Sequence, residues 1–233
     1  MAALESDPEW VAERDRREAE HQARVDEWRR AEAPLVGELQ GLGYPVKSVW
    51  ELYRHKPYAD AVPVLLRHLG GEYPARVREG IARALGVPEA REAWGELVAV
   101  FRREQEKGPK DGLAVALGSL CDVGDEGQVS TVVELAGDAS HGSSRLLLFG
   151  VLERSGRADA YAVLEQAAED PAVAGEAERI LRRWPRPSGG EDSGGRSELR
   201  WSVEGLVASS AGDEPWVRAR AGGSAESRVR GGG

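Results

Sequence analysis

The sequence contains few residues of several types, and each shortage excludes a kind of bond, site or segment. Among its 233 residues there is one cysteine, Cys121, so an intrachain disulfide is excluded, and so is a site built from several thiolates. The longest apolar runs, such as LLLFGVL at 146–152, are far shorter than the roughly 20 residues needed to cross a membrane. The first residues, MAALESDPEW, lack the basic and apolar regions of a secretory signal. We therefore predict a soluble, cytoplasmic protein.

Other shortages concern the coding bias of the gene. Asparagine is absent, Thr131 is the single threonine, and four lysines stand among 31 lysines and arginines. Amino acids encoded by AT-rich codons are thus scarce, which indicates a high-GC, bacterial genome. This bias carries no functional information.

The net charge is strongly acidic. The formal value is -9 for the whole chain, and residues 186–233 contribute nothing to it because seven basic and seven acidic residues balance there. An acidic excess disfavours general binding to the phosphate backbone of nucleic acids. It favours a protein partner, in particular a basic one.

The N-terminal region, 1–56, is predicted to hold a charged helical arm followed by capping helices. Trp10, Val25 and Trp28 form a narrow apolar stripe among many charged residues. We expect this long helix to dock along one edge of the remaining chain. The alternatives are a helix that binds a partner, or an arm that docks on another chain of a larger assembly.

A short helix is predicted before Pro57, which ends it. Val46, Val49, Trp50 and Tyr53 would share one face of this helix. We expect that face to cover the open end of the core behind it.

From residue 60 the chain repeats. First helices are predicted at 60–69, 93–104, 128–138 and 159–170, and second helices at 75–86, 110–120, 142–156 and 175–184. Leu65, Val98, Val133 and Leu164 are separated by 33, 35 and 31 residues. A second series on the second helices has similar spacing, which indicates amphipathic helix pairs that bury their apolar faces against neighbouring pairs.

The segment DAVPVLLRHL…ARVREGIARALG resembles a HEAT repeat, with a proline in the first helix and Arg78 near the start of the second. SRLLLFGVLERSG repeats the second-helix pattern with Arg145, whereas Lys110 and Asp111 stand where the intermediate repeat would carry its arginine. The resemblance covers about 57–184. It implies an all-α fold: a right-handed α-solenoid of HEAT-type hairpins at 57–185, used as a protein-binding scaffold.

After Trp184 the composition changes. Residues 186–233 are rich in glycine, serine and arginine, and no apolar period persists. Such composition is typical of disorder. We predict a disordered C-terminal tail.

The stretch DASHGSSR places an acid, a histidine and serines close together. A catalytic triad needs a scaffold that arranges the three groups in space and an oxyanion site, and adjacency in sequence supplies neither. The other interpretation is a turn between helices, in which Gly142 adopts a positive φ and Ser143 or Ser144 caps the second helix. His141 would then bond a neighbouring turn. We favour the turn.

Arginines of the second helices are the candidate binding residues. Arg78 and Arg145 occupy matching repeat positions, with Arg76 and Arg83 nearby; together with His141 they form the predicted binding set. They would bind an acidic group of a partner, or form a structural ladder to Asp side chains and carbonyl groups of the neighbouring turn. We favour the ladder.

No catalytic residue, metal site or cofactor is predicted. The four histidines lack the spacing of a zinc motif, and phosphate-binding glycine motifs are absent. The leading hypothesis is a non-catalytic scaffold or adaptor, of a regulatory or immunity type, that binds a basic protein. The alternative is a HEAT-like enzyme, either a DNA glycosylase for alkylated bases or a bilin lyase. That enzyme would gather Arg76, Arg78, Arg83, Arg145 and Arg182 on one face.

Overall fold

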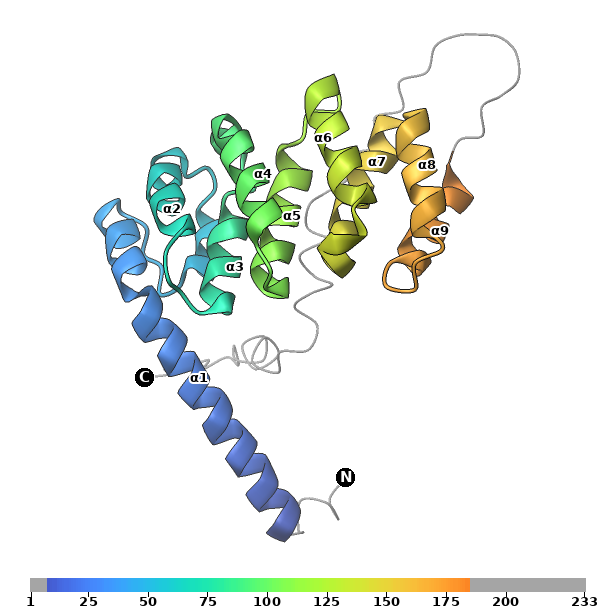
Figure 1. The fold of residues 1–233 in the computed structure, drawn as a ribbon. Helices are drawn as coiled ribbons and strands as arrows, with labels where there is room; N and C mark the ends of the chain where they lie inside the picture. Colours follow the sequence, from blue (N-terminus) through green and yellow to red (C-terminus); the bar gives the residue numbers. More distant parts are fainter. Residues whose placement is uncertain (1–7, 185–233) are drawn as a thin grey trace, which may run out of the picture. The chain divides into compact units, whose positions relative to one another are not determined.

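The computed structural model describes residues 8–184, and all structural statements below concern that range (Figure 1). Contacts divide the chain into Met1–Ser188 and Gly189–Gly233, so the described residues belong to the first unit. The predicted tail at 186–233 lies outside them. Residues 8–184 are helical throughout their regular structure and contain no strand, which confirms the all-α prediction for this part.

The elements are nine α-helices and four 3-10 helices. The α-helices are α1 (Pro8–Gly41), α2 (Val62–Leu69), α3 (Ala75–Ala84), α4 (Trp94–Arg103), α5 (Lys107–Leu120), α6 (Glu126–Gly137), α7 (Phe149–Ser155), α8 (Ala158–Ala167) and α9 (Ala174–Arg183). The 3-10 helices are η1 (Val49–His55), η2 (Ala59–Ala61), η3 (Pro88–Ala93) and η4 (Ala139–Leu148). All eight segments predicted from the repeat are helical.

The helices pack in consecutive pairs (Figure 1). α2 contacts α3, α4 contacts α5, α6 contacts η4 and α7, and α8 contacts α9. Each pair also touches the next, through α3 with α5, α5 with η4, and α7 with α8 and α9. Each pair therefore buries its apolar face against its neighbours, as the sequence period requires.

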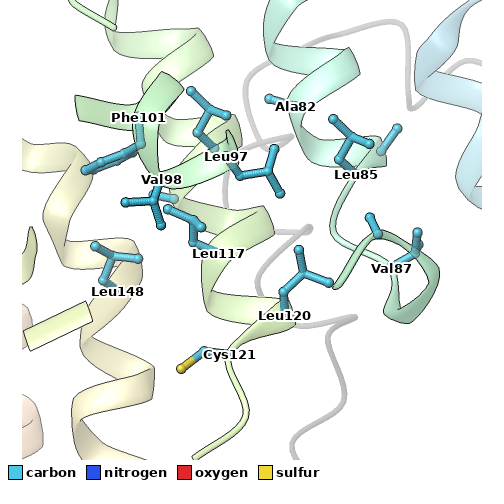
Figure 2. Close-up of a cluster of buried hydrophobic side chains, with 14 of the residues drawn as sticks. Ala82, Leu85, Val87, Leu97, Val98, Phe101, Leu117, Leu120, Cys121 and Leu148 are labelled. Carbon is cyan, nitrogen blue, oxygen red and sulfur yellow. The ribbon is translucent and has the colours of Figure 1, made fainter. Parts of the chain in front are cut away.

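The centre of the core lies between α3, α4, α5 and η4, where large apolar side chains of all four elements meet (Figure 2). Leu85, Leu97, Phe101, Leu117 and Leu148 are all fully buried there. Burial of each such side chain contributes about 1.5–3 kcal/mol. Trp94 and Trp184 pack against this core while partly exposed.

Two glycines permit close approach between successive helix pairs, which we call units from here on. A Cβ at Gly80 would lie 2.6 Å from Cγ1 of Val49, and a Cβ at Gly112 would lie 2.7 Å from the carbonyl oxygen of Glu79. Both distances are far below ordinary contact. At these points the backbone of α3 packs directly on side chains of η1, and the backbone of α5 packs directly on α3.

The first two-thirds of α1 differ from the docked helix predicted above. Every buried side chain of α1 lies at Glu32 or beyond, and Trp10 is 40% exposed. Docking along its whole length was therefore wrong: Glu32, Leu35 and Leu39 are buried, whereas Pro8–Ala31 hold no buried side chain. The narrow, charge-interrupted stripe is too poor in apolar area to bury the earlier part.

The helix before Pro57 also departs from prediction in its buried face. Val49 and Leu52 are buried, whereas Tyr53 is 56% exposed. The segment η1 is a 3-10 helix, in which residues three apart share a face, so the α-helical pairing of Val49 with Tyr53 was wrong. Ser48 caps η1 by accepting from the N–H of Trp50.

No helix within residues 8–184 has the length and apolar character needed to cross a membrane.

Candidate functional site

The DASHGSSR segment links α6 to α7: Asp138 follows α6, and residues 139–145 belong to η4. Asp138 ends α6 and caps η4, where its carboxylate accepts from the N–H of Ser140 at 2.8 Å. Gly142 has φ +59°, as the sequence predicted. The cap formed at the start of this segment is not one of the predicted serines: Asp138 caps the 3-10 turn that precedes the kink at Gly142.

His141 is buried in this turn. Its ring meets the edge of Phe101 at a centroid distance of 4.7 Å, and its Nε2 lies 3.7 Å from Oδ2 of Asp138. Burial, together with the positive charge of Lys110, lowers the pKa of His141, and Asp138 opposes that shift only in part. Its Nδ1 has no hydrogen-bond partner among the described residues, serine hydroxyls included. The ring is thus a neutral, packed group at neutral pH.

Arg145 is 3% exposed and bonds two neighbouring turns. One terminal nitrogen donates to the carbonyl oxygen of Ala136 at 3.4 Å, and the other forms an ion pair with Asp170. Asp170 lies in the turn before α9, so the guanidinium joins the third helix pair to the fourth. Its Nε is buried without a partner among residues 8–184.

Arg78 makes the equivalent connection two units earlier. Its guanidinium donates to Glu104 at 2.9 Å and to Glu106 at 2.6 Å, both in the turn between α4 and α5. Glu104 is well buried, with a side chain only 10% exposed. Arg78 therefore joins the first pair to the second.

Lys110 occupies the intermediate position. It is 5% exposed, its Nζ donates to the carbonyl oxygen of Glu104 at 2.9 Å, and it lies 5.2 Å from the centre of the Phe101 ring. Burial lowers the pKa of this lysine, while the charges of Glu104 and Asp138 oppose that shift. We call Arg78, Lys110 and Arg145 the cation row.

The acidic partners of the cation row end successive first helices. Glu104, Asp138 and Asp170 are separated by 34 and 32 residues, close to the helix-pair period. Arg78 and Arg145 thus each pair with the acid that follows the first helix of the next helix pair, whereas Lys110 is influenced by Asp138 only through its charge. The repeat spacing is the signal that would have identified these acids from sequence, since they recur with the apolar positions.

Arg76 and Arg83 form a separate cluster on α3. The Arg76 guanidinium lies 3.8 Å from the centre of the Trp50 ring, whose N–H donates to the Arg76 carbonyl at 3.1 Å. Glu79 lies between the two arginines, 3.5 Å from Arg76 and 2.9 Å from Arg83. Trp50 was expected on the covering face of the helix before Pro57, but its contact with Arg76 was not predicted.

The five arginines whose gathering would favour an enzyme are therefore dispersed among separate carboxylates. Arg76 and Arg83 share Glu79, while the other three contact different acids: Arg78 with Glu104, Arg145 with Asp170, and Arg182 with Glu178 at 3.5 Å. Each of the predicted binding residues is thus engaged within the chain.

Cys121 is a buried free thiol. Burial raises the pKa of the Cys121 thiol to about 11, so the thiol packs as a small apolar group at neutral pH. Within residues 8–184 no three His, Cys, Asp or Glu side chains are placed to hold a metal ion. Comparisons with family models, curated proteins and solved structures find no match to this chain.

Proposed function

We propose that the chain is a non-catalytic protein-binding scaffold whose helix pairs form a HEAT-type α-solenoid. The observation that carries this proposal is the cation row. Arg78 and Arg145 join successive pairs through carboxylates at repeating positions, as expected when each unit is stabilised only by its neighbours. A stack fixed in this way offers a preformed surface at little entropic cost to binding.

The partner of this scaffold is a basic protein. The whole net charge of -9 falls on residues 1–185, and the arginines of the second helices are neutralised inside the chain. Several carboxylates are exposed at the turns between successive helix pairs: Glu89, Glu92, Asp122, Asp125 and Glu126. These turns, not the arginines, are the surface that would attract positive charge.

Affinity capture with the full chain tests the proposal. The bait variant Glu89→Lys/Glu92→Lys reverses charge on η3. The control Glu20→Lys/Glu27→Lys makes the same charge change on exposed positions of α1. Lysate of the native host is applied, and eluates are read by mass spectrometry and ultraviolet absorbance.

One stoichiometric basic protein, retained by wild type and control but lost from the η3 variant, supports the proposal. If all three baits retain the partner equally, the binding surface does not lie on the turn at η3. Recovery of nucleic acid without protein contradicts the scaffold function and favours the glycosylase-like alternative. Arg78 and Arg145 are unsuitable test positions because their replacement would disturb the stack itself.

A further inference from the structure

The part of α1 without a fully buried side chain, Pro8–Ala31, carries a regular seam that reaches the core at Trp28, which packs partly against it. Val11, Arg14, Glu18, His21, Val25 and Trp28 recur at alternating spacings of three and four residues, and we call these six residues the seam. The same spacing continues through Glu32, Leu35 and Leu39, which are buried. An α-helix with this period presents all these positions on one face, the geometry of a two-helix coiled coil.

The side chains of α1 that are partly shielded from solvent lie mainly on the seam. Between Pro8 and Arg30 the side chains of intermediate exposure are Val11, Glu13, His21, Val25 and Trp28, and four of these five belong to the seam. The side chains on the opposite face, such as Ala23, are exposed. The part of the helix outside the core therefore has one distinguishable face, and that face is continuous with the face that packs on the core.

We propose that this face pairs with the same face of a second copy of the chain, in antiparallel orientation. The charges at the centre of the seam decide the orientation. A parallel pair would place Glu18 against Glu18 and Arg14 against Arg14 of the second copy, two like-charge contacts in the interface. An antiparallel pair instead places Glu18 against His21 of the second copy, twice by symmetry.

The antiparallel register is fixed by the ends of the seam. Val11 then faces Trp28 of the second copy, and the aliphatic part of Arg14 faces Val25, with its charged end at the edge of the interface. Any shift of this register either shortens the overlap or drives α1 against residues from Glu32 onward, which the core already occupies. The overlap runs for about 36 Å at 1.5 Å per residue.

Pairing through α1 gives each assembly two stacks of helix pairs. Two identical binding surfaces on one dimer would bind a partner with repeated or paired sites more tightly than one surface can. This consequence is independent of which residues of the stack contact the partner.

Sedimentation velocity of the full chain tests the pairing. The seam variant is Val25→Arg, and the matched control is Ala23→Arg, which adds the same charge on the opposite face of the same turn. We expect a concentration-dependent dimer for the wild type and the control. Val25→Arg should weaken the dimer about tenfold or more, because it places a second guanidinium against Arg14 of the second copy, twice by symmetry. Circular dichroism of each variant establishes that α1 remains helical.

Cysteine crosslinking tests the orientation. Glu18→Cys and His21→Cys chains are mixed and oxidised, with the native Cys121 buried. Antiparallel pairing gives the mixed 18–21 disulfide, whereas parallel pairing gives 18–18 and 21–21 and overturns the orientation. A wild-type chain that remains a monomer up to its highest soluble concentration overturns the proposal. A dimer that Val25→Arg and Ala23→Arg leave equally intact also overturns it.

Discussion

The outer and middle positions of the cation row carry different residues and contact different partners. Arg145 and Arg78 each reach a carboxylate of the following unit, whereas Lys110 donates to a backbone carbonyl of its own unit. A guanidinium has several donors in a fixed fork and bonds two turns at once, which a single ammonium on a flexible stem does less well. The outer positions therefore join successive units, while the middle position mainly supplies a hydrogen-bond donor to a backbone carbonyl in its own turn.

The largest expected effect comes from Arg145→Met. The free energy of unfolding should fall by about 3 kcal/mol, the lower end for breaking a buried ion pair, because Asp170 keeps some contact with water. Chemical denaturation followed by circular dichroism measures it. In the double variant Arg145→Met/Asp170→Asn the two losses should not add, and full additivity would show that the two residues do not interact.

A smaller loss is expected for Arg78→Met. We expect about 2 kcal/mol, because Arg78 is partly exposed but Glu104, left without its cation, is well buried. The same denaturation experiment measures the loss. Glu106→Gln, which removes only the exposed partner, serves as control and should cost less than about 1 kcal/mol. Equal losses in the two variants would contradict the central role given to Glu104.

Lys110→Met should cost only about 1 kcal/mol. Burial already disfavours the charge of Lys110, and methionine keeps most of the packing against Phe101. Thermal unfolding of Lys110→Met and Arg145→Met, measured side by side, compares the stability that each position contributes. A loss as large as that of Arg145→Met would show that the middle position also joins units.

The smallest effect is a pH dependence at His141. Its pKa in the folded chain lies below the ordinary 6.5, so the unfolded chain binds the proton more readily between these two values. The free energy of unfolding should therefore fall as pH is lowered through that window, and the loss is complete below the folded pKa. Denaturation from about pH 7.5 to about pH 5.5 compares wild type with His141→Phe, in which this slope should diminish. Identical slopes would contradict the assignment.

The helices could be predicted from the sequence because apolar periodicity is a local signal. All eight repeat segments were found, and Arg78 and Arg145 were recognised as equivalent. Their partners were not, since Glu104 and Asp170 meet them only when one unit stacks on the next. Tyr53 was misplaced because the pattern does not distinguish an α-helix from a 3-10 helix over one turn. The capping role of Asp138 was missed for the same reason, since the short turn starts earlier than its glycine indicates.

Side-chain size at one buried position of each unit governs how closely units approach. Gly80 and Gly112 belong to a series, with spacings of 32, 32 and 33 residues, that continues through Ser144 and Ala177. The side chain is absent at Gly80 and Gly112 and present at Ser144 and Ala177, and helix contacts are extensive between α3 and α5 but slight between α7 and α9. A small residue at these positions thus accompanies close packing of successive helix pairs. Larger side chains there would push the pairs apart from inside and leave the exposed side chains unchanged.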